Sequence, residues 1–194
     1  MTSSLSIDPR TSALLVMDVQ TAIVEGFAAD KTALLAWTTS LIEVVRKAGM
    51  KIIYVVVGFR PGYPEVSPRN HSFSPIRESG RFAAGSAGTE VHPDIAPKQG
   101  DVIVTKHRVS AFAGTDLDMI LRANGIDTLV LTGIATSGVV LSTVRHAADA
   151  DYRIVIAEDC CSDRDPEVHR VLMEKVFPRQ ATVLKAEAVV GALA

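Results

Sequence analysis

The chain has 194 residues, of which 47% are apolar, and its formal charge at pH 7 is −2. This composition argues against disorder, and the lack of a long basic run argues against a nucleic-acid or membrane-surface partner. No apolar stretch approaches the ~20 residues that a membrane span needs. The first ten residues are polar and lack the apolar centre of a signal peptide, so we expect a single cytoplasmic domain over residues 1–194.

Short β-rich runs alternate with amphipathic stretches, which is typical of a parallel sheet with crossover helices. The first strand is predicted at 13–17. Asp30 can cap a helix that runs to about residue 47, and a continuous apolar strand follows at 51–57. From 58 to 100 the periodicity disappears. Prolines and glycines dominate this long loop, whose aromatic residues favour an ordered excursion that serves as a lid or an interface.

Regular structure is predicted again from residue 101 onward. A strand at 102–105 precedes a helix that begins at a Thr115–Asp118 capping box and ends before Gly125. The remaining expected elements are, in chain order, a strand at 128–132, a helix at 138–150, a strand at 153–157, a helix at 165–177, a strand at 182–184 and a short final helix. With right-handed crossovers, this order predicts an α/β fold: a three-layer α/β/α sandwich with a six-stranded, mostly parallel sheet.

Three signals at strand ends indicate where the function lies. Asp18 follows the first strand, Lys106 follows the strand at 102–105, and a turn at 133–139 follows the strand at 128–132. If these strands are parallel neighbours, the three signals meet at the carboxyl edge of the sheet, where open α/β sheets bind ligands. A desolvated Asp18 suits proton transfer, although it could also cap its turn. Lys106 could hold an anionic substrate or be a solvated strand-end lysine.

The segments around these signals resemble the isochorismatase-like cysteine hydrolase family. The resemblance rests on Leu-Val-Met-Asp-Val-Gln at 15–20, Ser-Ala-Phe-x-x-Thr-x-Leu at 110–117 and Gly-Ile-Ala-Thr-Ser-Gly-Val-Val at 133–140. It implies that Asp18 and Lys106 are catalytic, that the peptide between Ile134 and Ala135 is cis, and that backbone amides form an oxyanion hole. The family has its nucleophilic cysteine at the position of Val139, and a valine cannot form a thioester.

The same segments supply further binding candidates. The amides of Ala135 and Val139, together with Thr136 and Gln20, are candidates for binding a substrate or an oxyanion, because a helix N-terminus offers free amides. Arg60, in the long loop, is a candidate for a substrate carboxylate or an exposed loop residue.

Cys160 and Cys161 follow the predicted strand at 153–157, and we interpret them as buried small residues rather than nucleophiles. An adjacent pair predicts neither a disulfide framework nor a zinc site. Nicotinamidase-type members of the family carry metal ligands after the second strand. This chain reads Gly-Phe-Arg-Pro-Gly-Tyr there, so we expect no catalytic metal and no cofactor.

Three functions are compatible with these residues. The leading hypothesis is a hydrolase of a small anionic molecule, such as a vinyl ether, with Asp18 as proton donor, Lys106 as anchor and no cysteine nucleophile. A catalytically silent scaffold for small-molecule binding or assembly is the first alternative. An amidase that uses Cys160 or Cys161 is the second. The abundant apolar residues and the long aromatic loop predict a homodimer or a homotetramer.

Overall fold

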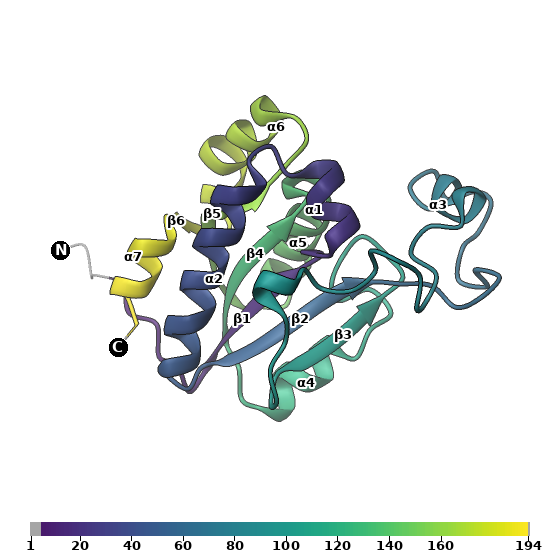
Figure 1. The fold of residues 1–194 in the computed structure, drawn as a ribbon. Helices are drawn as coiled ribbons and strands as arrows, with labels where there is room; N and C mark the ends of the chain where they lie inside the picture. Colours follow the sequence, from purple (N-terminus) through teal and green to yellow (C-terminus); the bar gives the residue numbers. More distant parts are fainter. Residues whose placement is uncertain (1–4, 194) are drawn as a thin grey trace.

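The computed structural model describes residues 5–193, and these residues contain a six-stranded sheet (Figure 1). The strands lie in the order β3-β2-β1-β4-β5-β6, and all neighbouring pairs are parallel. They are β1 (Ser12–Met17), β2 (Lys51–Val57), β3 (Val102–Lys106), β4 (Thr128–Ile134), β5 (Arg153–Ser162) and β6 (Thr182–Leu184). The central strands β1 and β4 are continuous runs of buried residues because helices cover both faces of the sheet.

The helices form a layer on each face of this sheet, except for one short helix that lies on the 58–100 loop. They are α1 (Thr21–Phe27), α2 (Lys31–Lys47), α3 (Ser74–Ser79), α4 (Leu117–Ala123), α5 (Leu141–Asp149), α6 (Pro166–Val171) and α7 (Ala186–Gly191). α1, α2 and α7 pack in one apolar cluster with Leu14 and Val16 of β1, whereas α4 and α5 pack in another with Ala13 and Leu15. One strand serves both clusters because successive side chains point to opposite faces. The predicted three-layer α/β/α fold is therefore confirmed.

All six predicted strands are present, but β4 and β5 extend beyond their predicted ends. β5 runs to Ser162, so Cys160 and Cys161 lie inside this strand. The prediction that they follow the strand is therefore wrong. The pairing of β4 with β5 shifts register after Leu131 and resumes where Gly133 meets Cys161. This irregularity accommodates the charged pair Glu-Asp at 158–159, which interrupts the apolar run in the sequence.

Side-chain caps are seen at two of the predicted helix starts, whereas α4 begins at Leu117 without the Thr115–Asp118 capping box that we expected. Asp30 and Asp165 cap α2 and α6 through their side chains, as expected. α1 was not predicted, because its N-cap residue is Gln20, which is not one of the residue types that usually mark a helix start. The helix expected at 138–150 begins as a π-helical turn, Thr136–Val140, and continues as α5. None of the helices within residues 5–193 combines the length and the apolar character that crossing a bilayer requires.

The loop at 58–100 is an excursion that contains α3 and the 3-10 turn Pro93–Ile95. Buried Phe59 anchors it, with its ring centroid 5.6 Å from that of Tyr63 and 5.5 Å from that of Phe73. The end of the loop returns to the main body, where Val91 forms an antiparallel bridge with Gln20. Figure 1 shows α3 on an arm beyond the carboxyl ends of the strands.

Candidate active site

Asp18 and Lys106 form a buried ion pair at the carboxyl edge of the sheet. Asp18 Oδ2 lies 2.8 Å from Lys106 Nζ, and the two side chains are only 8% and 3% exposed. The expectation that β1 and β3 are neighbours is wrong, since β2 lies between them. Two strand spacings separate the backbones by about 10 Å. A lysine side chain is long enough to cross most of this gap, so the acid and the amine meet nevertheless.

The backbone at the end of β1 fixes the position of the carboxyl group. Asp18 has a φ of 56°, in the left-handed region, and its N–H donates to the carbonyl of Val55 at 2.8 Å. Short polar residues such as aspartate enter this region more readily than bulky ones. The left-handed residue ends the strand and leads the chain toward α1.

Burial dominates the electrostatics of this pair. It raises the pKa of Asp18, and the positive charge of Lys106 opposes the rise without cancelling it. Asp18 Oδ1 has no hydrogen-bond partner within the described part of the chain. The Lys106 ammonium donates to Asp18 and, at 3.1 Å, to the carbonyl of Arg108. An ammonium has three protons, so one is left for a ligand.

The turn between β4 and α5 is the third part of the site. The Ile134–Ala135 peptide is cis, as the family resemblance implied. Gly133 precedes it with a φ of 144°, and a Cβ at this position would collide with the carbonyl of Met17 in β1. Ala135 and Val139 line the same cavity as the ion pair, so the turn and the pair face a common space.

Side chains from the β5–α6 region hold this turn. Asp163 Oδ2 accepts the N–H of Ser137 at 2.7 Å, and the Thr136 hydroxyl lies 2.8 Å from His169 Nδ1. Thr136 is fully buried and does not line the cavity, so its contact supports the turn. Burial lowers the pKa of His169, which favours the neutral ring. Neither Asp163 nor His169 was predicted, and the only signal nearby is the helix start at Asp165.

The cavity in front of the ion pair has a volume of about 430 Å³. Side chains from α1, from the 58–100 loop and from the turn make up most of its wall. Phe27, Phe73 and Phe82 contribute aromatic rings. An apolar cavity with a few convergent polar groups is typical of a site for a small molecule.

Two predicted binding residues lie away from this cavity. The Gln20 amide donates to the carbonyls of Val57 at 2.9 Å and Thr89 at 2.6 Å, and it accepts the N–H of Val57 at 2.8 Å. Both of its donors are therefore occupied in tying β2 to the long loop. Arg60 is exposed and pairs with Glu65 at 2.5 Å. Neither residue lines the cavity of the ion pair, so the structure does not bring either of them together with Asp18 and Lys106.

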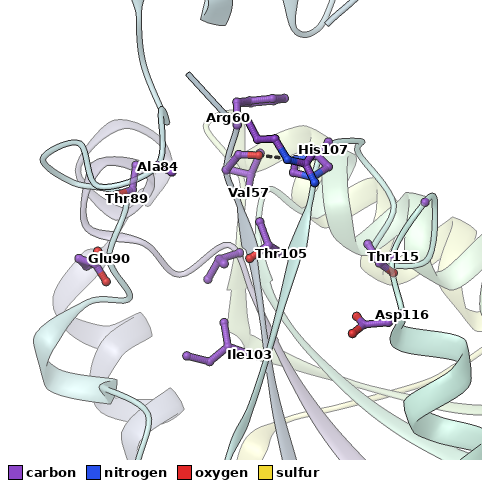
Figure 2. Close-up of a pocket in the computed structure, with 14 residues that line it drawn as sticks. Val57, Arg60, Ala84, Thr89, Glu90, Ile103, Thr105, His107, Thr115 and Asp116 are labelled. Atoms are coloured by element: carbon purple, nitrogen blue, oxygen red, sulfur yellow. Dashed lines mark hydrogen bonds between the residues drawn. The ribbon is translucent and has the colours of Figure 1, made fainter. Parts of the chain in front are cut away.

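A larger cavity of about 660 Å³ lies at the outer edge of β3. Figure 2 shows Ile103 on the edge strand, with Glu90 and Asp116 on opposite sides and Arg60 at one end. These three charged residues are exposed, so they stay solvated. The desolvated acid lies in the smaller cavity, and perturbed groups of this kind mark functional sites. We therefore place the candidate active site at Asp18.

The two cysteines lie outside the cavity of the ion pair. Cys160 and Cys161 are buried in β5, and burial raises the pKa of both thiols, that of Cys160 to about 12. Such thiols are not ionised near neutral pH, and the thiolate is the nucleophilic form. No group of three or more potential metal ligands occurs among residues 5–193.

Similarity to known proteins establishes the family. Residues 12–188 match the isochorismatase domain. The chain is 36% identical over 180 residues to the isochorismatase family protein YwoC of Bacillus subtilis, with 92% of each chain covered. It is 30% identical over 194 residues to the ureidoacrylate amidohydrolase RutB of Methylobacterium radiotolerans, covering 89% of this chain and 75% of that protein. The structure of N-carbamoylsarcosine amidase from Thermoplasma acidophilum is similar with a TM-score of 0.74 and 34% identity, covering 91% of this chain and 97% of that one. The chain therefore belongs to the isochorismatase family of hydrolases.

Proposed function

We propose that this protein hydrolyses a small molecule without a thiol nucleophile, with Asp18 as the general acid and Lys106 as the anchor of a negatively charged group. The observation that carries the proposal is the buried ion pair, whose members lie 2.8 Å apart and line an open cavity. A general acid works best when its pKa lies near the working pH. Because burial raises the pKa of Asp18, a larger fraction of this carboxyl group carries a proton than in water.

The residue at position 139 supports a mechanism without a covalent intermediate. The family resemblance places a cysteine nucleophile there, and in this chain the side chain of Val139 lines the cavity. The two cysteines of the sequence are buried in β5. Water is then the nucleophile, and the work of the protein is to move a proton and to hold the substrate.

A vinyl ether that carries a carboxylate suits an acid and an ammonium. Asp18 donates its proton to the terminal vinyl carbon, which leaves an oxocarbenium ion at the ether carbon. Water adds to that carbon and gives its proton to the Asp18 carboxylate. The hemiketal then transfers its hydroxyl proton to the ether oxygen as the C–O bond breaks, which releases an alcohol and a 2-oxo acid. One water is consumed and the acid is regenerated.

The open cavity favours this enzyme over the alternatives. A silent scaffold would be supported if Val139 and loop side chains filled the space in front of Asp18, but a volume of about 430 Å³ remains there. The amidase hypothesis with Cys160 or Cys161 loses its support because both thiols are buried elsewhere. Two relatives are named as amide-cleaving enzymes, so amides belong in the substrate panel.

Release of pyruvate from 2-(benzyloxy)acrylate, a vinyl ether with one carboxylate, tests the proposal. A coupled lactate dehydrogenase assay would compare the wild type with Asp18→Asn, which keeps the shape of the side chain but has no acidic proton. We expect the variant to lose activity by a factor of about 10²–10⁴, the usual contribution of a general acid. Iodoacetamide should leave the wild-type rate unchanged, because no thiol takes part.

Val139→Cys is the matched contrast, because it places a thiol where the family has its nucleophile. It would be assayed with the ether and with a panel of small amides that includes N-carbamoylsarcosine. Ether hydrolysis that persists in Asp18→Asn would contradict the acid mechanism. An inactive wild type, with amide hydrolysis only in Val139→Cys, would favour the scaffold.

The proposal also covers the domain organisation, the assembly and the metal independence of the protein. We propose a single domain over residues 1–194, a homodimer or a homotetramer, and activity without an added metal or cofactor. A cytoplasmic location stays a prediction. Sedimentation velocity would measure the assembly, and assays with and without EDTA would test the metal independence.

A further inference from the structure

Asp18 and Lys106 are the charged side chains that line the cavity of the ion pair. The other lining residues contribute apolar side chains, two serines and the backbone of the turn. Because Lys106 already neutralises Asp18 at 2.8 Å, the wall of the cavity has no excess positive charge. One carboxylate of a ligand can share the Lys106 ammonium, whereas a second carboxylate would meet no cation.

Each of the three phenylalanine rings that line the cavity also packs against a ring or a guanidinium group that does not line it. Phe73 packs edge-on against a second buried ring of the loop, with 5.5 Å between the centroids. The guanidinium of Arg164 lies 4.7 Å from the centroid of Phe27, and that of Arg81 lies 5.1 Å from the centroid of Phe82. Neither arginine lines the cavity, so both support the rings without adding a charge to the wall.

The 58–100 loop supplies much of the apolar wall. Phe73 and Phe82 are each 6% exposed, and Ile76 of α3 is half-buried. This loop lies outside the motifs that identify the family at 15–20, 110–117 and 133–140. Asp18 and Lys106 therefore come from other parts of the chain than this apolar wall. The residues of the wall can differ between related proteins while the reaction at the ion pair stays the same.

We infer that the substrate has an apolar ring or branched apolar body with at most one negative charge, and that Phe73, Ile76 and Phe82 determine this specificity. The inference rests on the proposed function in taking this cavity as the active site. Aromatic walls favour flat apolar ligands. A buried carboxylate without a partner loses its hydration and gains no compensating interaction, so a dicarboxylate of the same shape is rejected.

Binding of a matched pair of ligands tests the inference. Isothermal titration calorimetry of the wild-type protein would compare 4-methylbenzoate with terephthalate, which has a carboxylate in place of the methyl group. We expect 4-methylbenzoate to bind at least about tenfold more tightly. Equal or tighter binding of terephthalate, or no detectable binding of 4-methylbenzoate at millimolar concentrations, would overturn the inference.

A positive charge placed in the wall should change this preference. Ile76→Arg, and independently Ser72→Arg at an exposed lining position, should improve binding of terephthalate relative to 4-methylbenzoate by about tenfold. Ser79→Arg is the control, because it adds the same charge to α3 at an exposed residue that does not line the cavity. If neither lining variant moves the ratio beyond that of the control, the specificity role is refuted.

These titrations are independent of turnover. If the wild type hydrolyses no ether but shows the expected ligand preference, the proposed reaction is wrong while the inferred ligand class stands. If ether hydrolysis depends on Asp18 but terephthalate binds as well as 4-methylbenzoate, the reaction stands and the inference about specificity fails.

Discussion

Lys106→Met would remove the positive charge beside Asp18 while keeping most of the volume of the side chain. The substitution leaves a carboxyl group that is 8% exposed and whose Oδ1 has no partner among the described residues. Breaking one side of a buried ion pair costs about 3–5 kcal/mol, because the remaining charge is neither hydrated nor paired. We expect a loss of this size in the free energy of unfolding at pH 7.

The double variant separates the pair interaction from the cost of each substitution. Asp18→Asn alone leaves the buried Lys106 ammonium with neutral oxygen acceptors but no counter-charge, and should also cost about 3–5 kcal/mol. Asp18→Asn combined with Lys106→Met leaves no unpaired charge, and its cost should be about 1–3 kcal/mol, that of a buried amide with unmet hydrogen bonds. Urea unfolding followed by circular dichroism would measure all four proteins.

The pH dependence gives a second measure of the same carboxyl group. In Lys106→Met the folded-state pKa of Asp18 lies above its ordinary value of 3.8, since burial raises it and the opposing charge is gone. The stability deficit should therefore shrink as the pH falls from 7 toward 4, by up to about 1.4 kcal/mol per pH unit. Protonation of Asp18 stabilises the folded protein. This stabilisation is fully present below the unfolded-state pKa and is lost as the pH rises through the folded-state pKa. The reasoning would be refuted if the loss in the free energy of unfolding of the double variant equalled the sum of the two single losses. It would also be refuted if the loss in Lys106→Met did not change with pH.

Three further predictions concern the surroundings of the site. Gln20→Leu should lower the free energy of unfolding by about 2–4 kcal/mol in urea denaturation, because it removes the side-chain partner of the buried Val57 backbone and of the half-buried Thr89 carbonyl. Gly133→Ala should yield little folded protein by circular dichroism, since its Cβ would collide with Met17, while alanine at exposed Gly26 is the control. The two cysteine thiols should react with Ellman's reagent only after denaturant is added, and rapid reaction of the native protein would contradict their burial.

Much of the fold could be predicted because the strand and helix signals are local. The apolar runs of β1 and β2 and the aspartate that caps α2 lie within short windows of sequence. α1 escaped prediction because its N-cap residue, Gln20, is not one of the types that usually mark a helix start. The last residues of β5 escaped because two charged residues interrupt its apolar pattern, and only pairing with β4 restores the strand. Pairing is a property of two distant segments, which no local window contains.

The candidate site divides in the same way. Asp18, Lys106 and the turn after β4 were found from motifs that stand at strand ends, where the fold class itself brings ligand-binding groups. The motif that contains Gln20 does not reveal that its amide bonds to Val57 and Thr89, away from the cavity of the ion pair. The side chains that hold the turn, Asp163 and His169, escaped because their partners lie 26 and 33 residues away.

The α/β fold, the resemblance to the family, and the positions of Asp18, Lys106 and Val139 could all be taken from the sequence. Composition, periodicity and short motifs are enough for these features, because each depends on a short stretch of consecutive residues. The three-dimensional structure was needed to see that Lys106 reaches Asp18 across β2, that the pair faces an open cavity, and that phenylalanines from α1 and the 58–100 loop enclose it. The physical reason is that distance, desolvation and the shape of a cavity arise from segments far apart in the chain, and they exist only once the sheet has brought those segments together.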